Sequence, residues 1–155
     1  MSETASDRYG LFLDLSELLT GFTRVQLLGT GVAGDYLRAL EEVVPANVVN
    51  ELLAAYAQLP ADGVRETAAA SEILADPKLG PVARNLITMW YCGTWAELPD
   101  EWREAHGTSP LDADRVISPE AYLAGLQWVA AGAHPMGARQ QGFGAWALPP
   151  ETVTK

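Results

Sequence analysis

Apolar residues recur every three to four positions through most of this chain, whereas alternation of apolar and polar residues is nearly absent. A spacing of three to four residues places apolar side chains on one face of a helix. The pattern therefore predicts an all-α fold, a small helical bundle of about five or six helices.

Stripes of apolar residues predict three helices in the first part of the chain, over about residues 15–28, 32–44 and 46–59. Gly29 is expected to end the first helix, and Pro45 prevents the second helix from continuing. The connections between these helices are short, so we expect consecutive helices to be antiparallel neighbours.

Two further helices are predicted over about residues 64–74 and 81–92. The next stretch is polar, with one short helix at about residues 100–105. The Ser-Pro-Glu sequence at 118–120 combines an N-cap hydroxyl, a proline at the first helical position and a first-turn carboxylate. It predicts a last helix that continues to about residue 131.

The end of the chain differs in composition from the rest. Residues 132–155 are rich in glycine and proline but also contain large aromatic residues. No repeat or interdomain linker stands out. We therefore predict one domain, residues 1–155, with a helical body over about 14–131 and an extended C-terminal arm over about 132–155.

Composition and charge exclude several classes of protein. With 155 residues and 48% apolar side chains, the chain is large enough to bury a core without disulfides or a structural metal. Its net charge of −10 and evenly scattered arginines disfavour nucleic acid as a partner. No apolar run is long enough for direct membrane insertion.

Residues suited to catalysis or metal binding are few. The two histidines, His106 and His134, lie far apart, and the single cysteine is Cys92. A metal site needs three or four converging ligands, so we predict none. Cys92 follows an apolar helix, where an unpaired cysteine is usually a small buried hydrophobe. We assign no catalytic, cofactor-binding or metal-binding residue.

Two other patterns have structural interpretations. Glycines at 29, 31 and 34 match the spacing of a dinucleotide-binding loop, but they follow a predicted helix rather than a strand. A turn between helices is the better interpretation. The carboxylate pair Asp112 and Asp114 has the residue type of a general acid and base, but we expect both on an ordinary solvated surface.

The distribution of aromatic residues exceeds what a small helical core needs. Large aromatics on a glycine-rich arm are a frequent means of anchoring one protein on another. We therefore predict a partner interface that includes Trp95, Trp128, His134, Pro135, Phe143 and Trp146. An arm folded back on its own helices is the alternative.

Several short sequences occur in an order typical of one family. They are LSELLTGF at 15–22, WYCGTW at 90–95, SPEAY at 118–122, HPMG at 134–137 and GFGAW at 142–146. Together they resemble the small subunit of bacterial membrane-bound, FAD-dependent sorbitol and fructose dehydrogenases. The resemblance covers most of the chain.

The resemblance implies a non-catalytic accessory subunit that binds, stabilises and matures a large flavoprotein. In that family the large subunit carries FAD and the sugar site, and a cytochrome subunit with haem c often passes electrons onward. The resemblance implies a periplasmic complex at the inner membrane. Residues 1–10 lack the twin-arginine pair of the family's export signal, so a cytoplasmic complex is the alternative expectation.

A second function from another class stays open. The chain could be a self-standing helical enzyme or small-ligand-binding protein with a pocket near His134, formed partly by the Gly-rich arm. An isolated monomer with an ordered C-terminus and a bound metabolite would favour this alternative. A subunit would instead depend on its partner for part of its order.

Overall fold

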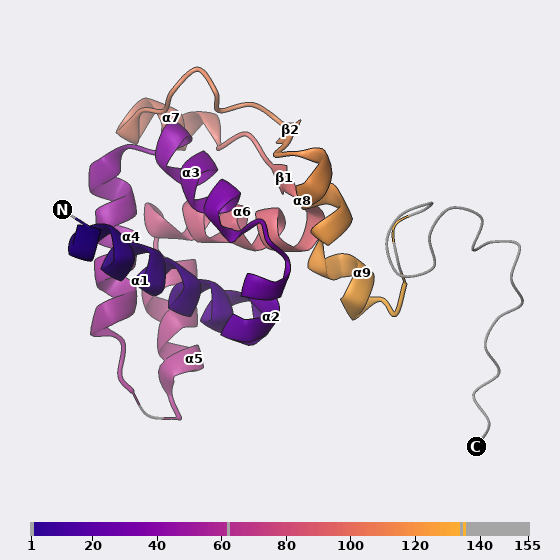
Figure 1. Cartoon of the computed structure of the whole chain (residues 1–155). Helices are drawn as coiled ribbons and strands as arrows, with labels where there is room; N and C mark the ends of the chain where they lie inside the picture. Colours follow the sequence, from indigo (N-terminus) through magenta and orange to yellow (C-terminus); the bar gives the residue numbers. More distant parts are fainter. Residues whose placement is uncertain (1, 62, 134, 136–155) are drawn as a thin grey trace, which may run out of the picture.

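A computed structural model describes residues 2–61, 63–133 and 135 of the chain (Figure 1). The described residues are mostly helical, and the predicted all-α fold is confirmed. The helices are α1 (Ser2–Thr20), α2 (Arg24–Gly29), α3 (Ala33–Val43), α4 (Ala46–Gln58), α5 (Arg65–Ala69) with the π-helical η1 (Ala70–Leu74), α6 (Leu79–Cys92), α7 (Asp100–His106), α8 (Pro119–Ala124) and α9 (Leu126–Ala130).

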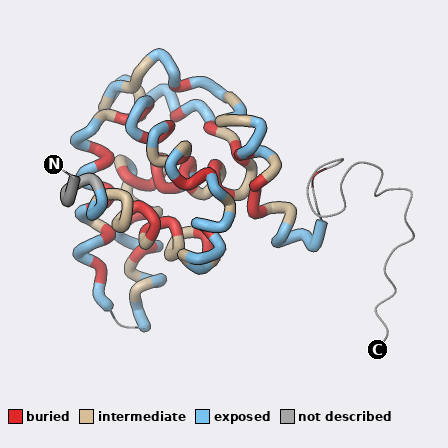
Figure 2. The backbone as a smooth tube through the Cα atoms, in the orientation of Figure 1, coloured by how far each residue is buried: buried red, intermediate tan, exposed pale blue. Residues whose placement is uncertain are grey.

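Helix α6 lies at the centre of the body and contacts α1, α3, α4, η1, α8 and α9. Its Val82, Leu86, Met89 and Trp90 side chains are fully buried. Figure 2 shows buried stretches where these helices meet. One apolar cluster therefore joins the N-terminal helices to the last ones.

The second and third predicted helices correspond closely to α3 and α4. Proline at position 45 lies between them, as the sequence indicated. The apolar stripe of α4 is wholly buried: Val48, Val49, Leu52, Leu53 and Tyr56. Periodicity was a sufficient guide here because one face of each helix packs against the core.

The single helix predicted over 15–28 is wrong. The structure has α1, which extends back to Ser2, and a separate α2. Gly21 has a left-handed backbone (φ 77°) between them. The Thr23 side chain accepts a hydrogen bond from the Gln26 amide, and the Gln26 side chain accepts one from the Thr23 amide, at 2.9 Å. This reciprocal capping box starts a new helix.

The helical body also begins earlier than about residue 14. Phe12 and Leu13, just before the predicted start, are buried in the core, and α1 itself begins at Ser2. On α2 the buried residue is Leu27, whereas Val25 and Leu28, which would continue the apolar stripe of a single helix over 15–28, are exposed. The rotation follows from the break at Gly21, which resets the helical phase.

The last predicted helix is divided at Gly125 into α8 and α9. Gly125 has an extended backbone, and a β-carbon added there would lie 2.7 Å from the Tyr91 carbonyl oxygen. The close approach of the two backbones explains both the glycine and the break. A single helix over this range would place Tyr122, Leu126 and Val129 on one apolar face, but only Leu126 is buried, and Tyr122 and Val129 are exposed.

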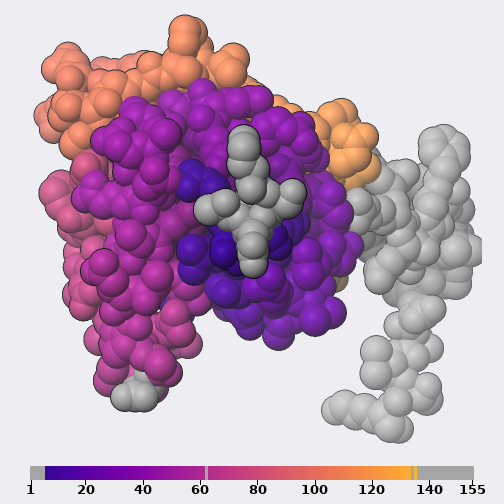
Figure 3. All heavy atoms as spheres, turned by 60° about the vertical axis from the view of Figure 1, so that its left-hand side comes forward, coloured from indigo at the N-terminus to yellow at the C-terminus, as the bar shows by residue number. Residues whose placement is uncertain are grey.

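A small antiparallel sheet joins the polar stretch to the rest of the body. Strand β1 (Thr94–Trp95) pairs with β2 (Arg115–Val116), and Thr94 lies opposite Val116. Figure 3 shows the segment that follows α7, in orange, packed over the purple atoms of α3. Ser109 donates its amide hydrogen to the Val43 carbonyl at 3.1 Å there.

Candidate functional site

Trp95 is not available for the predicted partner interface. Its side chain is only 1% exposed, and its indole Nε1 donates a 2.8 Å hydrogen bond to Oδ1 of Asp112. Trp95 is the second residue of β1, just after the turn that ends α6, and its side chain packs into the core. A tryptophan with a buried partner for its N–H is a core residue.

Trp128 and Tyr122 form an aromatic pair on α8 and α9. Their ring centroids lie 5.7 Å apart at 80°, an edge-to-face arrangement. The Trp128 indole Nε1 donates a hydrogen bond to the Tyr122 carbonyl at 3.0 Å. The ring contact and the indole hydrogen bond together fix the position of Trp128 relative to Tyr122.

Tyr122, Trp128 and Val129 leave apolar surface open to solvent. Tyr122 is 44% exposed and Val129 is 67% exposed, whereas Trp128 is half-buried. We call these three residues the α8–α9 surface. Its aromatic rings are of the kind that bury well against another protein, and the packing of Leu126 into the core fixes α9 beneath them.

The other predicted interface residues lie near or beyond the end of the described chain. Pro135 is described and buried, outside any helix. His134, Phe143 and Trp146 lie outside the described residues, as does most of the predicted arm. The pocket near His134, the alternative interpretation, also falls there.

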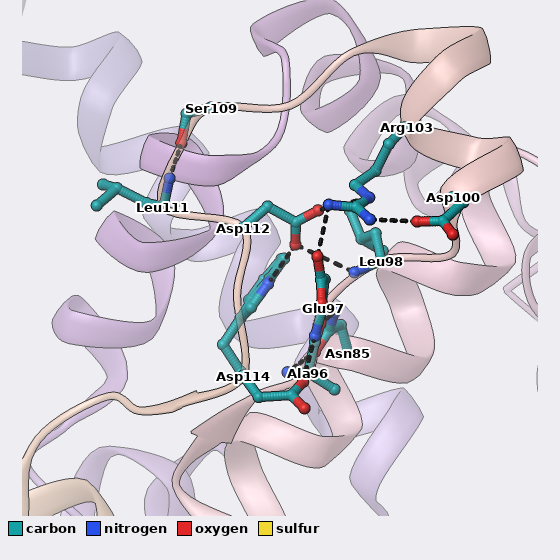
Figure 4. A network of polar contacts seen from close by, with 11 residues as sticks. Asn85, Ala96, Glu97, Leu98, Asp100, Arg103, Ser109, Leu111, Asp112 and Asp114 are labelled. Carbon is teal, nitrogen blue, oxygen red and sulfur yellow. Dashed lines mark hydrogen bonds and ion pairs between the residues drawn. The ribbon is translucent and has the colours of Figure 1, made fainter.

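Asp112 is buried, contrary to the surface position predicted for it. Its Oδ1 accepts hydrogen bonds from Trp95 Nε1 and from the Leu98 amide at 3.1 Å (Figure 4). Its Oδ2 is buried without a hydrogen bond to any described group and lies 3.9 Å from Nε of Arg103. The sequence placed Asp112 on the surface together with Asp114, because no neighbouring residue distinguishes the two carboxylates.

The side chains of Asn85 and Asp114 form hydrogen bonds with the backbone of residues 96 and 97. The Asn85 side chain donates to the Ala96 carbonyl at 2.6 Å and accepts from the Ala96 amide at 2.9 Å. Asp114 accepts from the Glu97 amide at 2.7 Å. Residues 95–98 are thus fixed by side chains from α6 and from the segment before β2 (Figure 4).

Arg103 closes the network on its solvent side. It forms ion pairs with Glu97 at 2.5 Å and with Asp100. The hydrogen bond to Asp100 is the main cause that raises the pKa of the Arg103 guanidinium. Arg103 therefore stays charged beside Asp112, and the network fixes residues 95–98 to the segment that precedes β2.

Other predicted features have plain structural roles. Gly29 ends α2, and Gly31 (φ 75°) lies in the turn before α3, so the helix–helix turn is confirmed. Cys92 is half-buried at the end of α6 rather than fully buried. His106 lies beside Trp102, with 4.9 Å between ring centroids.

Within residues 2–61, 63–133 and 135 the structure has neither a cluster of metal ligands nor a membrane-spanning helix. No group of three or more His, Cys, Asp or Glu side chains there is placed to hold a metal ion. No helix in this part of the chain has the length and apolar character needed to cross a membrane.

Comparisons with protein-family models, curated proteins and solved structures found no match to this chain. Function must therefore be inferred from the chain's own residues. Among the described residues predicted for an interface, the structure leaves Trp128 at the surface, and it adds Tyr122 and Val129 beside it.

Proposed function

We propose that this chain is a non-catalytic accessory subunit that binds and stabilises the FAD-containing large subunit of a sugar or polyol dehydrogenase. The observation that carries the proposal is the α8–α9 surface, a fixed aromatic pair beside an exposed valine. The resemblance of short sequences in this chain to the small subunits of that family supports the choice of partner. One of these sequences, at 118–122, lies at the start of α8 and includes Tyr122.

Edge-to-face aromatics give large contact areas with few rotatable bonds. Burying Tyr122 and Val129 against a partner would remove apolar area from water at about 25 cal/mol per Å². Because the Trp128 indole is already hydrogen-bonded within the chain, its burial would leave no polar group unpaired. The surface therefore has the properties of a binding hot spot.

The supporting structure reduces the entropic cost of binding. Ile117, just before α8, donates its amide hydrogen to the Gly93 carbonyl at 2.9 Å. Ser118 caps α8 by accepting from the Ala121 amide at 3.0 Å. Since α8 is fixed to the end of α6, little ordering of its backbone is needed when a partner binds.

In this proposal the redox chemistry belongs to the partners. FAD and the sugar site would lie in the large subunit, and haem c, where present, in a third subunit. A periplasmic location at the inner membrane belongs to the same proposal, with a cytoplasmic complex as the alternative. This chain would contribute surface and stability to the complex rather than reacting groups.

Co-expression tests the proposal. The FAD-dependent large subunit of a sugar or polyol dehydrogenase from the family that the chain resembles is produced with the wild-type chain, with Val129→Asp, with Val25→Asp, and alone. Val25 is the matched control, because it is 79% exposed but lies on α2. We expect wild type and Val25→Asp to raise flavin content and dye-linked activity, and Val129→Asp to lose that effect. Equal flavoprotein yield, flavin content and activity in all four samples would refute the proposal.

A further inference from the structure

A cavity of about 400 Å³ lies between the first half of α6 and α7, apart from the α8–α9 surface. A cavity of this volume is in the range that holds small organic ligands. Much of its wall is apolar and rigid, because it consists of three proline rings and a tryptophan: Pro77, Pro81, Pro99 and Trp102. Three residues with charged or titratable side chains also line it: Arg84, Glu101 and His106.

The apolar wall is already fixed in the absence of a ligand. Trp102 is only 4% exposed, and its indole Nε1 donates a 2.8 Å hydrogen bond to the Lys78 carbonyl. The His106 ring packs against the Trp102 ring, with 4.9 Å between the two centroids. Proline rings lose no side-chain entropy when they are covered. A ligand that packs against this wall therefore pays little for ordering it.

Arg84 is a cation in this wall without a counter-ion. Its side chain is exposed and forms no ion pair with a carboxylate in the described part of the chain. Most of the described cations do form such pairs: Arg8, Arg24, Arg38, Lys78 and Arg103. The chain has 20 acidic residues and only 10 lysines and arginines. An exposed arginine that no carboxylate neutralises is therefore an exception in this protein.

The end of η1 fixes the orientation of Arg84. Its Nη1 donates a 2.8 Å hydrogen bond to the carbonyl of Leu74, the last residue of this π-helical turn. Gly80 makes room for the contact, because an added β-carbon would lie 2.5 Å from the Leu74 oxygen and 3.1 Å from Nη1. π-Helical turns are rare and often occur at functional sites. The π-helical turn and the glycine are thus evidence, independent of the cavity itself, that the guanidinium is held in one position.

The remaining donors of Arg84 match a carboxylate. With Nη1 bonded to Leu74, Nε and Nη2 remain, and neither forms a hydrogen bond with a described group. These two atoms carry the parallel N–H pair that binds both oxygens of one carboxylate. Glu101, in the same wall, forms no ion pair with a described residue and would repel a second negative charge. The wall therefore favours an anion with a single charge over a phosphate or a dicarboxylate.

We propose that this cavity binds a small monocarboxylate with an aromatic or alicyclic ring. Its two oxygens accept hydrogen bonds from Nε and Nη2 of Arg84, and its ring packs against the prolines and Trp102. His106 has a ring N–H donor in every protonation state and forms no hydrogen bond with a described group, so it can add a polar contact. The proposal does not depend on the accessory-subunit function, since no residue of the α8–α9 surface lines the cavity.

Titration of the isotope-labelled full chain with hydrocinnamate, followed by NMR, tests the proposal. We expect saturable shifts at physiological salt that include the Arg84 Nε–H signal, no saturation with the uncharged hydrocinnamamide, and weaker binding of the dianion benzylmalonate. Arg84→Gln should weaken hydrocinnamate binding at least tenfold, and Arg84→Lys severalfold, because lysine lacks the planar pair of donors. Arg38→Gln, at an exposed arginine of α3 outside the cavity, is the matched control and should bind as wild type does.

Two further variants distinguish binding in the cavity from a general attraction of anions to an arginine. Ala105→Trp fills the cavity and keeps Arg84, so it should abolish binding. Glu101→Gln removes the repelling charge and should tighten hydrocinnamate binding severalfold; an unchanged affinity would overturn the assignment of a singly charged ligand. The whole proposal is overturned if hydrocinnamate does not saturate, if the amide binds as tightly, or if either Arg84→Gln or Ala105→Trp binds as wild type does with unchanged circular dichroism.

Discussion

The indole nitrogen of Trp95 and Oδ1 of Asp112 are joined by a 2.8 Å hydrogen bond in the interior of the protein. One residue follows α6, and the other precedes β2. The bond therefore closes a loop around α7 and holds two otherwise polar segments against the core. The Asp112 side chain is 1% exposed, so neither atom can exchange this partner for water without local opening.

We predict that Asp112→Ala lowers the free energy of unfolding by about 3 kcal/mol. The substitution leaves the Trp95 indole and the Leu98 amide as buried donors without partners, at about 1–3 kcal/mol each before relaxation. Urea denaturation followed by tryptophan fluorescence measures the change. Asp114→Ala is the control, because Asp114 is exposed and should cost under about 1 kcal/mol. Equal losses for the two variants would contradict a special role for Asp112.

Gly93→Ala should be one of the most damaging single-methyl additions in the chain. The residue has a left-handed backbone (φ 70°), and an added β-carbon would lie 2.5 Å from the Ala121 carbonyl group. The conformational penalty and the clash together should lower the free energy of unfolding by about 3 kcal/mol. Thermal denaturation of the full chain measures it.

Gly21→Ala separates the cost of the left-handed backbone from the cost of the clash with Ala121. Gly21 has nearly the same backbone (φ 77°), but an added β-carbon there meets nothing within 4 Å. Its expected loss is about 1–2 kcal/mol, the conformational penalty alone. A loss at Gly21 as large as that at Gly93 would show that contact with α8 is not what restricts position 93.

Tyr36→Phe should leave the protein as stable as wild type or stabilise it by about 1 kcal/mol. The Tyr36 hydroxyl and the Trp90 Nε1 are both buried without a hydrogen bond to any described group, although their rings pack edge to face at 4.8 Å. Deleting an unpaired buried hydroxyl removes its desolvation penalty and keeps the ring contact. A loss of more than about 1 kcal/mol in chemical denaturation would show that the hydroxyl is satisfied in solution.

The same tyrosine predicts how stability depends on alkaline pH. Burial is the main cause that raises the pKa of Tyr36, with the charge of Asp35 as a further cause. In the unfolded chain tyrosine ionises near pH 10. Above that pH the unfolded state loses a proton that the native state keeps, so stability falls by up to about 1.4 kcal/mol per pH unit for this residue. Denaturation at about pH 9 and about pH 11 should show a smaller fall in Tyr36→Phe than in wild type.

Tyr122→Ala should weaken binding to the proposed flavoprotein partner by about 2 kcal/mol, as the loss of a hot-spot aromatic does. Tyr122 is partly exposed, so the isolated chain should keep its helicity. Surface plasmon resonance measures the change in Kd, and circular dichroism checks the fold. Unchanged affinity would count against the α8–α9 surface as the contact.

Helical periodicity was enough to predict α3, α4 and α6, because each buries one continuous face. It failed where local hydrogen bonds override the apolar pattern. The Thr23 and Gln26 capping box could have been found from its spacing in the sequence. The break at Gly125 could not, because it depends on the carbonyl of Tyr91, more than thirty positions earlier.

The candidate site shows the same limit. Counting aromatics placed Trp128 and Trp95 in the same interface group, although Trp128 is half-buried and Trp95 is in the core, because composition does not reveal which indole has a buried acceptor. The acceptor, Asp112, looks like any loop carboxylate in the sequence. Its role depends on contacts between segments 17 positions apart, which no local pattern encodes.

Helix α1 has a consequence for how the protein is made. Its buried residues Phe12, Leu13 and Leu15 find their contacts on α4 and α6, which are synthesised later. Until α6 has left the ribosome, this apolar face lacks part of its native contacts, an interval of seconds at ordinary rates of translation. The nascent chain is therefore exposed to aggregation until α6 has been synthesised, and its yield in cells should depend on chaperones that bind α1 during synthesis.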